Sequence, residues 1–231
     1  MSEFHHVSVL LEECIQGLAI KPDGVYVDGT LGGAGHSSRI AAKLTTGRLI
    51  GIDRDNVALE AAAERLKPFE DRVTLVHANF CDMDQALQEL GWTPDIITGA
   101  SVGALNGCLF TMGKSKEAED LWRRLEIHDV LEVPDSLKPE ELNNFFLDVV
   151  RSGGLNVEPL AETIDRLIDE DAVRRSPIRF GLVMTELGTM RRVQCPVEKI
   201  PEGRMKDYLL GSSACFPALR PREIDGGKYI D

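Results

Sequence analysis

The sequence predicts an α/β protein with a mainly parallel, three-layer sheet and helices on both faces. Short apolar segments alternate with longer segments of helical periodicity, which is the pattern of strand–helix–strand units. A glycine-rich turn follows the first apolar segment, and a turn with two glycines around a serine follows the fourth. Such turns at strand ends are typical of α/β proteins that bind ligands at the carboxyl edge of the sheet. With 231 residues, of which 43% are hydrophobic, the chain is large enough to bury its own core.

The elements alternate regularly over the first half of the chain, residues 1–91. The expected strands are 25–27, 49–52 and 73–76, and the expected helices are 8–18, 37–44, 56–66 and 84–90. In the second of these helices Ile40 and Leu44 share one face, as in an amphipathic helix that packs on a sheet.

Helices dominate the second half, residues 92–231. The pattern predicts strands at 95–98, 179–185 and 190–195, helices at 104–112, 117–125, 139–150, 159–169 and 204–214, and the beginning of a strand or loop at 228–231. The sequence contains no internal repeat and no low-complexity linker between the halves. We therefore expect the two halves to merge into one domain.

The composition narrows the classes of function. The net charge is −12, and an acidic chain is a poor non-specific nucleic-acid binder because phosphate contacts need Lys or Arg. The five cysteines are widely spaced without a C-x-x-C pair, which favours reduced thiols in a cytoplasmic protein. No segment approaches the ~18 apolar residues of a membrane span. No His/Cys cluster has the spacing of a metal site, so we expect no metal.

A first candidate site lies at residues 28–36, a glycine-rich turn directly after the first expected strand. Glycines let a ligand approach the backbone closely, and the following helix offers unpaired N–H groups. Asp53 ends the second strand, where a carboxylate can accept hydrogen bonds from both hydroxyls of a ribose. This order of elements predicts a nucleoside-cofactor site, and a tight turn beside a solvated aspartate is the alternative.

The amino-acid sequence of this half resembles that of a known family. Residues 4–13, 28–37 and 51–55 resemble the bacterial methyltransferases that modify a cytosine N4 of 16S ribosomal RNA with S-adenosylmethionine. The resemblance covers residues 3 to about 91, and it implies S-adenosylmethionine as the cofactor.

The same resemblance implies roles for individual side chains. Ala34, Gly35 and His36 would line the methionine end of the cofactor, Asp53 would hold the ribose, and Phe80 would lie by the adenine. The later segments of that family, which complete the cofactor site and bind RNA, do not follow here, so this half would be truncated. Together with the negative net charge, this leads us to expect that ribosomal RNA is not a partner.

A second candidate site is Ser101, which lies between Gly99 and Gly103 after one expected strand and before a helix. A nucleophile elbow has this context: a tight turn lifts the hydroxyl above the sheet, and small neighbours relieve the crowding. A serine nucleophile needs a base. Because no histidine follows residue 128, Asp225 and Asp231 are the candidate partners of a Ser–Asp dyad.

The second half carries its own resemblance. Residues 94–107, 211–217 and 224–231 are similar to the patatin-like phospholipases, over residues 91 to 231. The resemblance implies a Ser–Asp dyad of Ser101 and, by its register, Asp231, although Asp225 has the literal Asp-Gly-Gly motif. It also implies that the N-terminal glycine-rich oxyanion loop and the C-terminal end of that family are lacking.

The two resemblances thus predict a chimera of two truncated α/β enzymes, with one half at residues 1–91 and the other at residues 92–231. The expected function is a patatin-like serine hydrolase that acts on an acyl-lipid or another ester. A truncated S-adenosylmethionine-dependent 16S rRNA methyltransferase is the alternative, and an inactive fusion fragment is a third possibility. By analogy with methyltransferase sheets, we expect residues 95–98 to lie beside the first strand.

Overall fold

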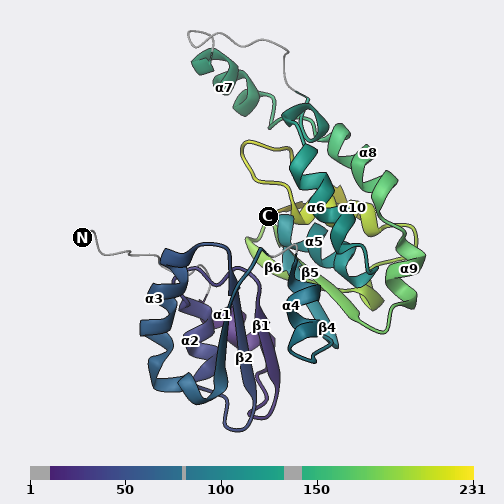
Figure 1. Ribbon diagram of the computed structural model, residues 1–231. Helices are drawn as coiled ribbons and strands as arrows, with labels where there is room; N and C mark the ends of the chain where they lie inside the picture. The colour runs from purple at the N-terminus through teal and green to yellow at the C-terminus, as the bar shows by residue number, and fades with distance from the viewer. Residues whose placement is uncertain (1–10, 80–81, 133–141) are drawn as a thin grey trace. The chain divides into compact units, whose positions relative to one another are not determined.

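The computed structural model describes residues 11–79, 82–132 and 142–231 (Figure 1). The chain divides into two compact units, unit 1 (Met1–Trp92) and unit 2 (Thr93–Asp231). Each unit combines strands with helices, and parallel strand pairs occur in both. The predicted α/β class is therefore confirmed.

Unit 1 is built on a parallel sheet of three strands in the order β1-β2-β3. The strands are β1 (Val25–Asp28), β2 (Arg48–Asp53) and β3 (Val73–His77). The helices are α1 (Leu11–Leu18), α2 (Gly35–Ala41), α3 (Asn56–Leu66), the 3-10 segment η1 (Lys67–Arg72) and α4 (Met83–Glu89). Because all three strands are parallel, their carboxyl ends share one edge of the sheet.

The core of unit 1 forms around β2. Leu49, Ile50 and Ile52 are buried, as expected for a central parallel strand with a continuous apolar run. The next helix, α3, begins where the Asp55 side chain accepts a hydrogen bond from Val57 N–H at 2.9 Å. Such an N-cap pairs a donor that the first turn of a helix leaves free.

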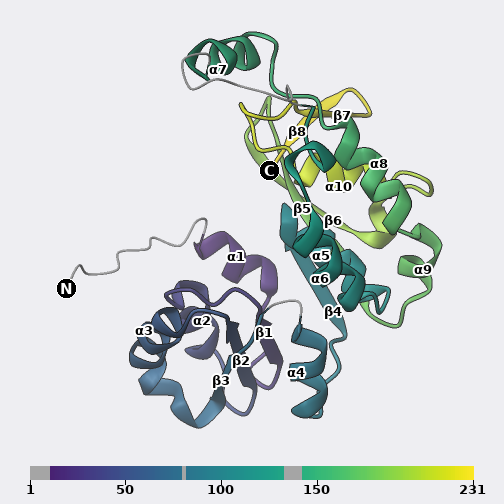
Figure 2. The ribbon, with the colours of Figure 1, turned by 45° about the horizontal axis from the view of Figure 1, so that its top comes forward.

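Unit 2 is built on a mixed sheet in the order β4-β5-β8-β7, with β6 also paired to β5. The strands are β4 (Ile96–Ala100), β5 (Arg179–Glu186), β6 (Arg191–Pro196), β7 (Arg222–Ile224) and β8 (Gly227–Ile230). The helices are α5 (Val102–Thr111), α6 (Ser115–Arg124), α7 (Leu142–Arg151), α8 (Glu158–Leu167), α9 (Glu170–Arg175) and α10 (Met205–Ser212), with the 3-10 turns η3 (Ile127–Asp129) and η4 (Val197–Lys199). Figure 2 shows β7 and β8 close to α10, and the contacts of the three elements agree.

The strand pairs place β4 and β8 on the same edge of β5. β6 pairs with β5 from Gly181 to Glu186 and therefore occupies one edge. β4 pairs with residues 179–183 of β5 and β8 with residues 185 and 186, so both must use the opposite edge. β4 is parallel to β5, whereas β8 is antiparallel to β5. The carboxyl ends of β4 and β8 therefore point toward each other along this edge.

One expectation about the sheet is wrong. Residues 95–98 do not lie beside the first strand, because β4 pairs with β5 in a second sheet, with Ile96 opposite Arg179. The two halves therefore do not share one sheet. Alternating strands and helices indicate parallel pairing, but they do not specify which strands pair, since a partner can lie far along the chain.

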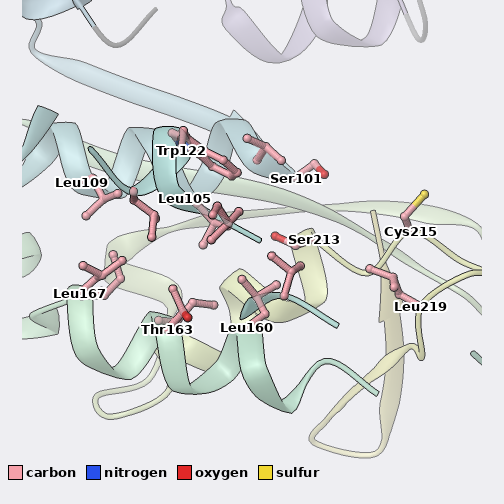
Figure 3. Close-up of a pocket in the computed structure, with 16 residues that line it drawn as sticks. Ser101, Leu105, Leu109, Trp122, Leu160, Thr163, Leu167, Ser213, Cys215 and Leu219 are labelled. Carbon is pink, nitrogen blue, oxygen red and sulfur yellow. The ribbon is translucent and has the colours of Figure 1, made fainter. Parts of the chain in front are cut away.

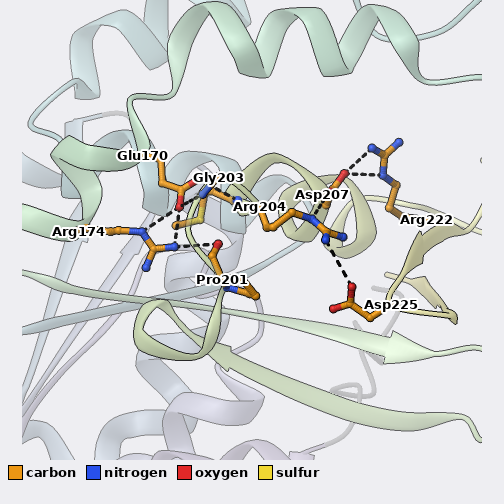
Figure 4. A network of polar contacts seen from close by, with 9 residues as sticks. Glu170, Arg174, Pro201, Gly203, Arg204, Asp207, Arg222 and Asp225 are labelled. Carbon is orange, nitrogen blue, oxygen red and sulfur yellow. Dashed lines mark hydrogen bonds and ion pairs between the residues drawn. The ribbon is translucent and has the colours of Figure 1, made fainter.

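A partly buried ion pair within α9, between Glu170 and Arg174, also binds the backbone of the segments before α10. The Glu170 carboxylate accepts hydrogen bonds from Arg174 Nη2 at 2.6 Å, from Gly203 N–H at 2.9 Å and from Met205 N–H at 3.1 Å (Figure 4). The Arg174 guanidinium also donates to three carbonyl oxygens, those of Val197, Ile200 and Pro201. This network ties two segments together that have no strand pairing between them.

Candidate functional site

The turn after β1 folds over the end of β2. Leu31 N–H donates to the Ile52 carbonyl oxygen at 3.1 Å, and Gly32 N–H donates to Asp53 Oδ2 at 2.8 Å. Gly32 and Ala34 both have left-handed backbone angles, with φ of 49° and 55°. A glycine adopts this conformation without strain, which explains why the turn needs one at residue 32.

Asp53 stands at the carboxyl edge of the sheet with one hydrogen bond to each oxygen. Oδ2 accepts from Gly32 and Oδ1 accepts from Asp55 N–H at 3.0 Å. A carboxylate oxygen has two lone pairs, so each oxygen of Asp53 retains capacity for a ligand hydroxyl. The side chain is thus held in place by the backbone and still able to bind.

His36 lies at the start of α2, beside this turn. Its Nε2 atom is buried and has no hydrogen-bond partner among the described residues. Ala34 is fully buried before it, and the nearby Ser37 hydroxyl donates to Asp28 Oδ2 at 2.7 Å. This ring nitrogen can therefore pair with a group that the described residues do not supply.

The predicted cofactor residues therefore gather in one place. Ala34, Gly35 and His36 follow β1, and Asp53 ends β2, whose carboxyl end shares an edge with β1. Phe80 lies outside the described residues. A ribose-containing cofactor fits this site, which offers the unpaired His36 Nε2, the glycine turn and the unused lone pairs of Asp53.

Ser101 occupies a strained turn between β4 and α5. Its backbone angles are φ 54° and ψ −132°, a combination that is costly for any residue with a side chain. A Cβ atom at Gly99 would lie 2.2 Å from the Gly103 carbonyl oxygen, so the turn requires glycine there. At Gly103 a Cβ would meet nothing within 4 Å, so the expected steric need for a small residue after the serine is not found.

The backbone of Ser101 is fixed from α10. Ser101 N–H donates to both Ser212 Oγ and the Ser212 carbonyl oxygen, each at 3.1 Å. The Ser212 hydroxyl donates in turn to the Val183 carbonyl oxygen at 2.6 Å. The sequence pattern assigns no role to Ser212, and only its place in the small-residue segment 211–214 distinguishes it.

Asp231 follows the carboxyl end of β8, which approaches the carboxyl end of β4 along β5. Ala100, the last residue of β4, pairs with Val183, and Ile230, the last residue of β8, pairs with Thr185. The residues that follow, Ser101 and Asp231, therefore both come next to the same stretch of β5, around Met184. Asp231 N–H donates to the Ala214 carbonyl oxygen at 3.0 Å, two residues beyond the one that holds Ser101. The fold thus brings the ends of β4 and β8 to the same short segment.

Asp225, the other candidate, has different surroundings. It lies at the tip of the β7–β8 hairpin with φ 49°, and its Oδ1 is 3.4 Å from Arg204 Nη1. Arg204 also pairs with Asp207, which accepts from Arg222 Nε at 3.0 Å (Figure 4). Burial alone would raise the pKa of Asp207, but the hydrogen bonds from Arg222 and Arg204 and their charges lower it below its ordinary value.

A pocket of about 250 Å³ opens beside Ser101 within unit 2 (Figure 3). Its walls come from α5, α6, α8 and the segment after α10, and they include Leu105, Leu109, Trp122, Leu160 and Leu219. The lining residues comprise no charged side chain. An apolar cavity of this kind favours neutral, largely hydrocarbon ligands.

The described residues contain no group of three or more His, Cys, Asp or Glu side chains that could hold a metal ion. In the same part of the chain, no helix has both the length and the apolar character needed to cross a membrane.

The geometry of the two sites is typical of two classes of α/β protein. Unit 1 has a glycine turn and an aspartate at the ends of adjacent parallel strands, an arrangement typical of nucleoside-cofactor-binding proteins. Unit 2 has a strained serine between a strand and a helix, an arrangement typical of a nucleophile elbow.

The chain belongs to the MraW methylase family, which matches residues 3–120, and to the patatin-like phospholipase family, which matches residues 74–231. Both resemblances seen in the sequence are thereby confirmed. The two matches overlap over residues 74–120, which include β4 and the Ser101 turn.

Several curated relatives are named methyltransferases. The ribosomal RNA small subunit methyltransferase H of Lachnospira eligens is 68% identical over 90 residues, which are 38% of this chain and 29% of that protein. The protein of the same name from Geobacter sp. (strain M21) is 33% identical over 235 residues, covering 95% of this chain and 68% of that protein. The solved structure of an rRNA methylase from Streptococcus thermophilus is 13% identical with a TM-score of 0.36, covering 58% of this chain and 93% of that chain.

The match extends over only part of several relatives. The chain spans between 29% and 36% of the length of several curated methyltransferases, including those of Lachnospira eligens and Paenibacillus sp.. The long alignment with the Geobacter protein shows that the likeness is not confined to unit 1.

The expectation about partners is wrong. We expected an acyl-lipid or ester as the partner and not ribosomal RNA, but the curated relatives are named ribosomal RNA methyltransferases. The net charge of the whole chain does not determine whether one of its surfaces binds RNA. Phosphate contacts depend on local basic groups, and a total of −12 does not describe any one surface.

Proposed function

We propose that the chain is an S-adenosylmethionine-dependent methyltransferase that acts on ribosomal RNA, at a cytosine N4 of 16S rRNA, and that unit 1 binds the cofactor. One observation carries the proposal: the buried, unpartnered His36 Nε2 lies beside the glycine turn that Asp53 holds in place. The family match and the methyltransferase relatives support the same function.

Each part of the site has a role in this proposal. When bound, the cofactor supplies a methyl group carried on a positively charged sulfur. Asp53 accepts hydrogen bonds from the ribose hydroxyls with the lone pairs that Gly32 and Asp55 leave free. His36 Nε2 would face the methionine end, where it could donate a hydrogen bond to the methionine carboxylate. The backbone of Ala34 and Gly35 lets the ligand approach closely.

The experiment measures cofactor binding and methyl transfer separately. Isothermal titration with S-adenosylmethionine is run on the full chain, on Asp53→Asn and on Glu60→Ala, an exposed position on α3. We expect Asp53→Asn to weaken binding by about tenfold, since one charged acceptor is lost, and Glu60→Ala to leave it unchanged. Saturation to about 100 times the dissociation constant should raise the free energy of unfolding by about 2.7 kcal/mol.

Transfer is then followed with radiolabelled methyl groups and small ribosomal subunits. Label on the RNA that disappears in Asp53→Asn supports the proposal. Binding without any transfer would contradict the methyltransferase activity and leave unit 1 as a binding module. No binding by the folded chain would overturn the proposal completely.

A second candidate function is nucleophilic chemistry at Ser101, with Asp231 as its base. The observation that favours it is the strained backbone of Ser101 at the point where β4 and β8 converge. In this step Ser101 Oγ forms a bond to an electrophile, its proton passes to the Asp231 carboxylate, and the leaving group departs.

A fluorophosphonate probe tests this second function, because phosphorus bonds to the serine oxygen and fluoride leaves. Labelling should disappear in Ser101→Ala and fall strongly in Asp231→Asn, whereas Asp225→Asn should be labelled like the unmodified chain. Loss of labelling in Asp225→Asn alone would reverse the assignment of the base. Labelling that survives Ser101→Ala would remove the function.

A further inference from the structure

The pocket beside Ser101 contains one buried polar group that nothing in the described chain satisfies. The Ser213 side chain lines this pocket, is only 8% exposed, and its Oγ has no hydrogen-bond partner among the described residues. In Figure 3 its oxygen points across the pocket toward Leu105. A buried hydroxyl without a partner is unfavourable, so it indicates a place where a ligand atom belongs.

We propose that this pocket binds a small, neutral molecule that is mostly hydrocarbon and carries one carbonyl oxygen, which accepts a hydrogen bond from Ser213 Oγ. A simple aryl ketone has this chemistry. The proposal does not depend on either function proposed above, because it requires no reaction at Ser101 and no cofactor.

The size of the pocket limits the ligand. A closed apolar cavity of about 150 Å³ is known to take up benzene, and sites for drug-sized molecules begin at about 300 Å³. The volume of about 250 Å³ lies between these values. It therefore suits one ring with a short substituent.

The lining excludes charged ligands. Its side chains are apolar or weakly polar, and none of the lining residues is Lys, Arg, His, Asp or Glu. A carboxylate or an ammonium group would lose its hydration here without gaining an opposite charge. The ligand must therefore be neutral.

Two other polar side chains of the lining are already engaged. Thr163 Oγ1 lies 3.4 Å from the Asp129 carbonyl oxygen, and Trp122 Nε1 donates to Asn106 Oδ1 at 2.7 Å. Ser213 thus offers one hydroxyl to a ligand inside the pocket. A ketone needs only a donor, whereas an alcohol would bring an O–H of its own that also needs a partner. This difference favours a carbonyl over a hydroxyl on the ligand.

The test compares ligands of one shape. Acetophenone, ethylbenzene and benzoate are titrated against the full chain by ligand-observed NMR, together with Ser213→Ala and two controls, Ser101→Ala and Thr163→Val. We expect acetophenone to bind about fivefold or more tightly than ethylbenzene, because only the ketone pairs with the hydroxyl. Benzoate should not bind. Ser213→Ala should bind both neutral ligands equally, and both controls should keep the preference for the ketone.

Several results would overturn the proposal. These are equal binding of the two neutral ligands to the unmodified chain, a ketone preference that survives Ser213→Ala, tight binding of benzoate, or no binding of acetophenone at all. If Ser213→Ala does not fold, Ser213→Cys, a weaker donor of similar size, replaces it and should reduce the preference. Ketone binding that persists in Ser101→Ala separates this result from the nucleophile experiment.

Discussion

The backbone N–H of Ser101 donates to the hydroxyl oxygen of Ser212 at 3.1 Å, across 111 positions of the sequence. Ser212 is fully buried, and its hydroxyl hydrogen is already used by the Val183 carbonyl oxygen on β5. The strained turn at Ser101 is therefore held by a side chain of α10 that is itself fixed to the sheet. Strain of this kind persists only where the surroundings hold it in place.

Replacing Ser212 should loosen this turn. Ser212→Ala removes an acceptor from Ser101 N–H and a donor from the Val183 carbonyl, so we expect the free energy of unfolding to fall by about 1–3 kcal/mol. Ser213→Ala is the matched control, because the Ser213 hydroxyl has no partner in the described chain to lose. Urea unfolding measures both variants. Equal losses in the two would contradict the role given to Ser212.

Glycine at position 99 should be essential, and glycine at position 103 should not. A Cβ at Gly99 would overlap the Gly103 carbonyl oxygen, so Gly99→Ala should destabilise unit 2 by about 3 kcal/mol. Gly103→Ala adds a methyl group in open space within α5 and should keep or raise stability by up to ~1 kcal/mol. Thermal unfolding of both variants checks the contrast, and a destabilised Gly103→Ala would show that the open space is not available.

The ion pair at Glu170 should matter far more than its neighbour on α9. Glu170→Ala leaves Arg174 without its carboxylate and frees the N–H groups of Gly203 and Met205, so we expect a loss of about 3 kcal/mol. Asp171 is exposed and lies 3.9 Å from Arg175, and Asp171→Ala should cost less than about 1 kcal/mol. Denaturant titration gives both values. A ratio near one would mean that the Glu170 network adds nothing beyond a surface pair.

Asp207 should make unit 2 sensitive to acid. Its pKa lies below the ordinary value of 3.8 in the folded chain, so its contribution to stability is complete above that pH and is lost as the pH falls through the lowered pKa. The difference in unfolding free energy between the unmodified chain and Asp207→Asn should be constant from about pH 7 to about pH 5 and shrink below about pH 3.8. Urea unfolding across this range measures it, and a difference that grows in acid would reverse the sign.

The buried cysteines should resist alkylation while the chain is folded. Burial raises the pKa of the Cys108 thiol to about 12 and that of Cys195 to about 11, and only the thiolate reacts. Cys215 is exposed. Iodoacetamide at about pH 8 should therefore modify Cys215 in the folded chain, and mass spectrometry should find Cys108 and Cys195 modified only after denaturation. Modification of Cys108 in the folded chain at the rate of Cys215 would show that α5 opens readily.

The first candidate site was accessible to sequence reasoning because its parts are local. The turn at residues 28–36 is continuous, and Asp53 ends the very next strand, so strand order alone places them on one edge. Ser101 was found for the same reason, since its turn lies between two adjacent elements.

The rest depends on contacts between distant segments. Nothing near Ile96 indicates that β4 pairs with Arg179 and its neighbours rather than with the first strand. The roles of Ser212 and Ser213 also depend on how α10 packs against α5 and α8, which the periodicity of one helix does not reveal. The partner expectation failed because a total charge contains no information about position.

The strand pairs of the two units differ in how far they reach along the chain. In unit 1, Val25 pairs with Arg48 and Leu49 with Val73, so each strand joins the next one to be synthesised. In unit 2, β4 cannot pair until β5 has been synthesised, and helices α5 to α9 lie between the two strands in the sequence. Long-range strand pairing is slow, because the entropy cost of closing the intervening loop comes before any stabilising contact forms. During translation, a ribosome-bound chain would thus hold a finished first sheet while β4 still presents an open edge, the kind of surface on which nascent chains aggregate.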